Sequence, residues 1–178
     1  AVLITDPALE GSDILATARA LAAAISVGGY DLVLLGQQAG DSDCWALPGV
    51  LAELLEMPVV TQASQVGLAG TALSLERQTE AGYEKLGMDL PAVVSVSDAI
   101  NTPRYPSLKA IMGAKKKPLE QKSVADLGLD ASKVGAAGSG TTVLTFAQPP
   151  AKESGIKLEA DAASVERVVE FLAQKSLI

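Results

Sequence analysis

The sequence lacks histidine entirely and has one cysteine and few aromatic residues, which are only 3% of its 178 residues. Without histidine, imidazole acid–base chemistry, histidine-based catalytic triads and histidine-containing metal sites are excluded. The single cysteine, Cys44, excludes an internal disulfide and suits a reducing compartment. Because 48% of the residues are apolar while aromatics are scarce, we expect an aliphatic core rich in alanine.

Positive charge and long apolar runs are also in short supply. Lysine and arginine number 14 against 21 aspartates and glutamates, a net charge of −7. An acidic chain is poorly suited to nucleic acid or to an anionic membrane surface. No apolar run approaches the roughly 20 residues that span a bilayer, so we expect no membrane insertion.

The first 35 residues have the pattern of a strand, a helix and a second strand. Ala1–Ile4 is apolar, Ser12 is a plausible helix N-cap, and Gly28–Gly29 is a typical helix end. Leu32–Leu35 is apolar without polar alternation, which predicts a strand buried on both faces. We therefore predict a right-handed βαβ unit over residues 1–35.

The most informative stretch follows this second strand. Gly36 breaks the apolar run, a small polar loop follows, and an apolar stripe at helical spacing then comprises Leu47, Val50, Leu51 and Leu54. A helix start after such a loop is a common place to bind phosphate, because its first N–H groups lack intrahelical partners. Asp41 and Asp43 lie in the loop without a basic residue, so a ligand would be held by backbone and hydrogen bonds. A nucleotide pocket and a purely structural turn both remain open, and Gly36→Val is expected to crowd the turn.

Alternation and turn residues predict the rest of the sheet. Pro58–Thr61 is a candidate third parallel strand, and Ala92–Val96 a central one. Between them, alternating segments separated by turns at Gly70 and at Ala81–Gly82 predict a small antiparallel excursion.

The second half of the chain is less regular. A short helix of about two turns is expected around Leu108, Ile111 and Met112. The basic cluster Lys115–Lys117 has two interpretations, a solvated helix end and a binding site. Asp126–Gly140 is expected to be an irregular connector rich in glycine and alanine.

Three segments are expected at the C-terminal end. Thr142–Phe146 is predicted as a strand and Pro149–Ala160 as an extended stretch. A last amphipathic helix reaches Gln174, with the stripe Val165, Val168, Val169 and Leu172. A helix on an extended linker has little of its own domain to pack against, which suggests docking on another chain.

These patterns predict an α/β fold: a three-layer Rossmann-like parallel sheet with an antiparallel excursion and a C-terminal extended arm plus helix. We expect a nucleotide-binding α/β domain over residues 1–148 and a docking arm and helix over residues 149–178.

Several motifs, in order along nearly the whole chain, resemble the β subunits of electron transfer flavoproteins. They are Asp31–Gly36 with Gln38-Ala39, Asp41 and Asp43-Cys44; Ala63–Val66; Leu90–Val94; Asn101–Tyr105; Leu108 with Ile111-Met112 and Ala114–Lys117; Asp126–Gly128; and the C-terminal helix. The run from Pro103 to Lys117 is the most specific of these. Family members usually have a longer N-terminus that supplies a first strand and helix, so the resemblance implies a truncated or processed chain.

The resemblance implies a heterodimer in which an α subunit holds most of a redox-active FAD and the β subunit binds a structural AMP. By this likeness the AMP-binding residues are Gly36, Gln38, Ala39, Asp41, Asp43, Cys44, Trp45, Ala46 and Leu47. The family often has Asn-Gln-Thr where Trp45–Leu47 stand, but backbone amides there would serve equally well. Non-functional roles are also open for single residues: Cys44 as a small buried filler, Trp45 as loop packing, and the two aspartates as turn or cap residues.

The resemblance also implies an electron carrier subunit with no catalytic residues of its own. Its partners would be acyl-CoA or other dehydrogenases of fatty acid oxidation and a quinone oxidoreductase leading to the respiratory chain. Partner docking would involve Arg104, Tyr105, Leu108, Ile111 and Met112, with Leu108 as the anchor, although Leu108 could instead pack in the core. The compartment would be the bacterial cytoplasm, or the mitochondrial matrix in a eukaryote.

Two rival functions have distinct requirements. In a flavin-bifurcating relative the β subunit would bind a second, redox-active FAD instead of AMP. A stand-alone ATP-binding domain would need Lys or Arg with Mg²⁺ at the phosphates, and residues 36–47 contain no basic residue and no Walker motif.

Overall fold

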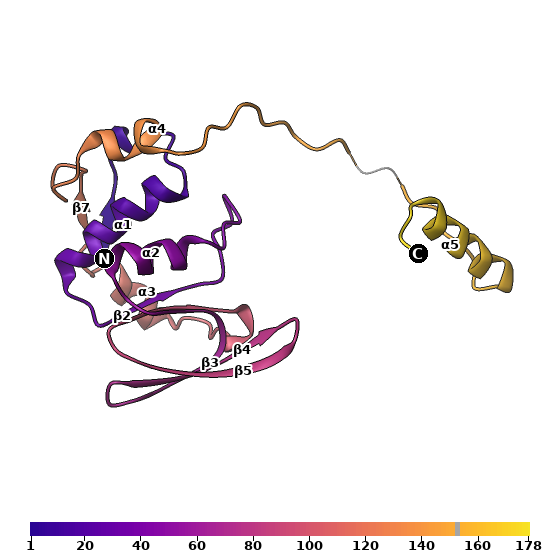
Figure 1. The fold of residues 1–178 in the computed structure, drawn as a ribbon, viewed down its shortest axis with the longest axis horizontal. Helices are drawn as coiled ribbons and strands as arrows, with labels where there is room; N and C mark the ends of the chain where they lie inside the picture. The colour runs from indigo at the N-terminus through magenta and orange to yellow at the C-terminus, as the bar shows by residue number, and fades with distance from the viewer. Residues whose placement is uncertain (152–153) are drawn as a thin grey trace. The chain divides into compact units, whose positions relative to one another are not determined.

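The structure, a computed structural model, describes residues 1–151 and 154–178. The chain divides into two units, Ala1–Thr142 and Val143–Ile178. The first unit combines helices with a mixed parallel and antiparallel sheet, which confirms the predicted α/β class (Figure 1).

The main sheet of the first unit has five strands in the order β2-β6-β3-β4-β5. Their bounds are Leu32–Leu35 (β2), Val59–Ala69 (β3), Ala72–Thr79 (β4), Gly82–Asp89 (β5) and Ala92–Val96 (β6). β6 pairs in parallel with β2 on one side and with the start of β3 on the other, so the predicted central strand is confirmed. β3, β4 and β5 pair antiparallel and form the predicted excursion.

Strand β3 takes part in both kinds of pairing because its ladder is interrupted near Gln62. Val59 and Val60 pair in parallel with Val93 and Val94 of β6. Gln62 then has a φ of 60°, and its N–H donates to the Ser95 hydroxyl at 3.0 Å. This irregularity changes the register before the strand continues as one arm of a hairpin.

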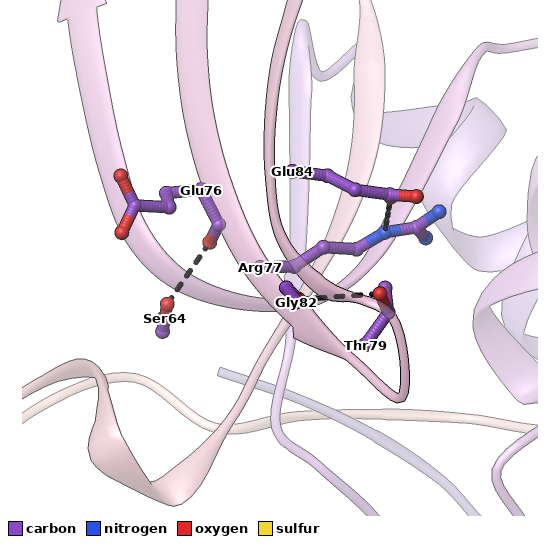
Figure 2. Close-up of polar contacts among 6 residues, drawn as sticks. All are labelled: Ser64, Glu76, Arg77, Thr79, Gly82 and Glu84. Carbon is purple, nitrogen blue, oxygen red and sulfur yellow. Dashed lines mark hydrogen bonds and ion pairs between the residues drawn. The ribbon is translucent and has the colours of Figure 1, made fainter.

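Polar contacts link strands β3, β4 and β5 of the excursion (Figure 2). The Arg77 guanidinium and the Glu84 carboxylate, which lie opposite each other on β4 and β5, are 2.7 Å apart. The Ser64 hydroxyl donates to the Glu76 carbonyl at 3.1 Å, and the Thr79 hydroxyl donates to the Gly82 carbonyl across the turn at 3.2 Å. Opposed charges on paired strands help to fix the register of the hairpin.

Two helices cover the sheet next to the candidate loop: α1 (Ile14–Gly28) and α2 (Leu47–Leu55). They pack against each other, and α2 contacts β3 and β6. The buried centre of this layer is Ala18, Ala22 and Leu51, with Leu21, Ile25, Leu35, Leu47, Val50 and Leu55 packed around it. The core is therefore aliphatic and alanine-rich, as expected.

Three details of this layer differ from the predictions. Leu54 is 41% exposed and Leu55 packs inward instead, so the predicted stripe of α2 is wrong at one position. Leu34 is 60% exposed because only one face of β2 is covered by the helices, so the strand is not buried on both faces. The N-cap of α1 is Asp13, one residue after the predicted Ser12, because the carboxylate accepts from two amides at the helix start.

The predicted βαβ unit of residues 1–35 is wrong in its pairing. β1 (Val2–Ile4) pairs in parallel with β7 (Glu120–Lys122) in a separate two-stranded sheet, not with β2. A short 3-10 helix, η1 (Pro7–Leu9), then leads toward α1.

The connector rich in glycine and alanine, residues 126–140, is folded back onto α1. It contains a 3-10 turn, η3 (Ala131–Lys133), and one helical turn, α4 (Gly135–Gly138). The Asp13 carboxylate accepts from the amides of Gly140 at 2.7 Å and Thr141 at 3.1 Å, in addition to capping the helix. Hydrogen bonds from the Ala16, Gly140 and Thr141 groups hold the pKa of Asp13 below its ordinary value.

The second unit contains α5 (Ala162–Gln174), which confirms the predicted C-terminal helix. Its N-cap Asp161 accepts from the Ser164 amide at 2.7 Å. A groove formed within this unit is lined by Leu158, Val165, Val168 and Val169, among others. The prediction of a strand at Thr142–Phe146 is wrong: the segment has no strand pairing, and Phe146 is 94% exposed. The extended stretch 149–160 has no helix or strand where it is described, and its residues 152–153 lie outside the described part.

Candidate nucleotide site and docking segment

The candidate nucleotide loop comprises residues 36–46, between the carboxyl end of β2 and the start of α2. Carboxyl ends of parallel strands are the usual position for ligands in open α/β sheets. Gly36 is exposed, and a Cβ built on it would meet no protein atom within 4 Å. The expectation that Gly36→Val crowds the turn is therefore wrong for the Cβ, which would enter open space.

The loop is organised by its own polar groups. The Gln38 side-chain amide donates to the Asp43 carboxylate at 2.8 Å. The Asp43 amide donates to the Ala39 carbonyl at 3.0 Å, and Asp43 has a φ of 48°. These bonds close the loop into a compact turn. They also leave the Asp43 carboxylate, one of two in the loop, hydrogen-bonded to a neutral amide.

The start of α2 leaves backbone donors without a capping side chain. Ala46 occupies the N-cap position and forms no side-chain cap, and the first helical bond runs from the Val50 amide to the Ala46 carbonyl. Pro48 has no N–H, so the amides of Leu47 and Gly49 are the donors at this end of the helix. They lie where the helix dipole favours negative charge.

The structure brings all nine predicted nucleotide-binding residues together, because they lie on this one loop and helix start. Gly36, Gln38, Ala39, Asp41, Asp43, Trp45 and Ala46 are exposed, whereas Cys44 and Leu47 are half-buried. Cys44 is a free thiol and is not the fully buried filler that was one interpretation. Trp45 is 51% exposed.

Sequence reasoning missed the residues that the neighbouring strand brings to the same edge. β6 is followed by the 3-10 turn η2 (Asp98–Ile100), and the Asp98 amide donates to the Gln37 side-chain carbonyl at 3.1 Å. The Ser97 hydroxyl oxygen is buried and has no hydrogen-bond partner among the described residues. The only signal in the sequence was that Ser97 and Asp98 directly follow a predicted central strand.

The candidate docking segment runs from residue 101 to residue 117 and is exposed throughout. It contains the expected short helix, α3 (Leu108–Ala114), whose N-cap Ser107 accepts from the Ala110 amide at 3.2 Å. Leu108 is 81% exposed and Tyr105 is 98% exposed, so the alternative of Leu108 as a core residue is wrong. Arg104, Ile111 and Met112 are exposed beside them, as are the lysines of the basic cluster 115–117.

Two other kinds of site receive no support from the described residues. Among them, no group of three or more acidic or cysteine side chains is arranged to hold a metal ion. Within the same residues, no helix is both long and apolar enough to cross a membrane.

Comparison with known proteins gives one consistent result. A family model described as electron transfer flavoprotein domain matches residues 1–127. The electron transfer flavoprotein subunit beta of Mycobacterium tuberculosis (strain ATCC 25618 / H37Rv) is 37% identical over 179 residues, which cover 100% of this chain and 67% of that protein. The proteins of the same name from Thermoanaerobacterium thermosaccharolyticum and Homo sapiens are 35% and 40% identical, covering 98% and 88% of this chain and 66% and 59% of their own lengths. The chain thus spans about two thirds of the length of these relatives or slightly less.

Proposed function

Because the chain belongs to the electron transfer flavoprotein family, as a β subunit, we propose that it binds AMP on the loop 36–47 and assembles with an α subunit that carries the redox-active FAD. Its role in electron transport within a flavoprotein follows from the family. We propose three further parts: AMP as the ligand, FAD as the partner's cofactor, and dehydrogenases and a quinone oxidoreductase as electron donors and acceptor. The chain would contribute no catalytic residue of its own.

The start of α2 is the single observation that carries the AMP proposal. The uncapped N-cap Ala46 leaves the Leu47 and Gly49 amides to bind an anion. One phosphate needs few donors, whereas a triphosphate needs cationic side chains and Mg²⁺, which the loop does not contain. Asp41 and Asp43 disfavour additional negative charge, so a monophosphate suits the loop better than ATP does.

A second candidate ligand is favoured by one specific feature. Where the family often has Asn-Gln-Thr, Trp45–Leu47 present no polar side-chain group except the indole N–H. Fewer side-chain contacts to a terminal phosphate are compatible with a dinucleotide, as in flavin-bifurcating relatives that hold a second FAD here. The identity of the released nucleotide distinguishes the two ligands.

The test is to co-express the chain with its α subunit, denature the purified complex and identify the nucleotides by chromatography. We expect AMP and FAD in equal amounts. Two equivalents of FAD without AMP would instead support the bifurcating relative. A complex that forms without any nucleotide on the β subunit would contradict the AMP proposal.

A glycine pair locates the site within the chain. A Cβ at Gly36 would enter open space at the loop. Gly36→Val should therefore lower AMP content, because its side chain takes up space that the nucleotide would occupy, without affecting folding. Gly87→Val is the matched control, because its Cβ meets the Leu73 carbonyl oxygen at an ordinary 3.8 Å on β5, away from the loop. Full AMP occupancy in Gly36→Val would show that the nucleotide binds elsewhere.

We further propose that residues 104–112 dock partner dehydrogenases. The exposed apolar side chains of Leu108, Ile111 and Met112 support this role, since such a group is unusual on a free surface. We propose that the protein acts in the cytoplasm if the organism is a bacterium, and in the mitochondrial matrix if it is a eukaryote.

A further inference from the structure

We propose that Gln37 is a positioning residue that couples the nucleotide loop to the docking segment, a role that rests on the proposed binding of AMP. Its side-chain carbonyl oxygen accepts from the Asp98 backbone amide at 3.1 Å. One partner of this bond lies in the loop after β2, and the other lies in the turn that opens the path to α3.

The sheet topology explains why these two positions meet. β2 and β6 are parallel neighbours, and their last paired residues are Leu35 and Ser95. Gln37 and Asp98 follow these residues closely, so both leave the sheet at the same edge. Gln37 is half-buried, whereas its neighbours Gly36 and Gln38 are exposed.

The turn that receives this bond is also held from the other side. The Ser97 amide donates to the Ala63 carbonyl of β3 at 2.9 Å, and the Ile100 amide donates to the Ser97 carbonyl at 3.2 Å. η2 is therefore fixed to β3 through Ser97 and to the nucleotide loop through Gln37. Residues 101–107 beyond it are exposed, so η2 is the fixed base from which the docking segment extends.

A nucleotide that orders the loop would restrain the Gln37 side chain and thereby strengthen its bond to Asp98. Coupling of this kind is reciprocal: a protein that binds the docking segment and restrains η2 would tighten the nucleotide to the same degree. The magnitude is limited because one hydrogen bond at a solvent-accessible edge carries it, so we expect effects of several-fold rather than hundreds-fold.

The experiment measures exchange of the Asp98 amide proton in the heterodimer, with and without AMP. In the wild type we expect AMP to slow this exchange several-fold. Gln37→Leu removes the acceptor at similar size, so it should accelerate Asp98 exchange, abolish the effect of AMP on it, and weaken AMP binding several-fold. Gln78→Leu, at an exposed position on β4, is the matched control and should behave like the wild type.

Gln37→Glu separates the hydrogen bond from mere packing. Its carboxylate keeps an acceptor, so Asp98 protection should return in the nucleotide-free complex, the state in which the added charge has no phosphate to repel. Equal Asp98 exchange in the wild type and Gln37→Leu would overturn the proposal, as would AMP binding to the wild type without any change at Asp98. A wild type that binds no AMP would overturn the coupling together with the proposed function, whereas the other two results leave AMP binding intact.

Discussion

Replacing Leu108 with alanine tests the docking segment most directly, because the structure separates its effect on folding from its effect on partner binding. The side chain is 81% exposed, so its truncation should change the free energy of unfolding by less than about 0.5 kcal/mol. If the leucine enters a pocket of a dehydrogenase, its burial contributes about 1.5–3 kcal/mol. Since about 1.4 kcal/mol corresponds to a factor of ten, Leu108→Ala should weaken the complex roughly ten- to hundredfold.

The assay is the rate of electron transfer from a partner dehydrogenase as the heterodimer concentration is varied. We expect a higher KM for the heterodimer, with flavin content and Tm near those of the wild type. Leu68→Ala is the matched control, because this leucine of β3 is also exposed, at 56%, but lies in the hairpin. An unchanged KM in Leu108→Ala would refute the docking role, and a large fall in Tm would show that the side chain is buried in solution.

The remaining predictions concern assembly, stability and pH. Deleting everything after Gln148 should weaken heterodimer formation and flavin retention, because it removes α5 and its groove; a tight, fully yellow heterodimer in gel filtration would contradict this. Leu51→Ala should lower the free energy of unfolding in urea by about 2–5 kcal/mol, because the side chain is 1% exposed, whereas Leu54→Ala at 41% exposure should change it far less. Asp13→Asn should flatten the acid side of the stability–pH curve: a lowered carboxyl pKa stabilises the fold above the ordinary value of 3.8 and loses this effect as pH falls through the lowered value.

The fold class was predictable because hydrophobic spacing and turn residues are local signals. α1 has Asp13 and Gly29 as its caps, next to the predicted Ser12 and within the predicted end Gly28–Gly29. The antiparallel excursion was found from alternation and its two glycine turns. What local pattern cannot supply is the identity of the partner strand.

Three errors share that cause. The pairing of β1 with β7 is invisible in the sequence, because Glu120–Lys122 is polar and does not resemble a strand. Thr142–Phe146 does resemble a strand but finds no partner in the described chain. The exposure of Leu34 depends on which face of β2 the helices cover, and a run of apolar residues is the same for one covered face or two.

Only those parts of the candidate site that are local in the sequence could be predicted. All nine residues predicted to bind the nucleotide lie between residues 36 and 47, so a local motif was enough to propose them. Gln37 was passed over because its partner, the Asp98 amide, lies 61 positions away, and backbone donors have no signature in a sequence. Open space at Gly36 likewise depends on surrounding atoms, so only the structure could show that an added Cβ meets no protein atom there.

The position of Trp45 makes the intrinsic tryptophan fluorescence of this chain specific to one loop. It is the sole tryptophan, and it lies half-exposed in the nucleotide loop. Intrinsic indole emission from the isolated chain therefore originates at the candidate site and nowhere else. The emission wavelength and its accessibility to a collisional quencher report the hydration of this one loop, so occupancy of the loop can be followed without attaching a dye.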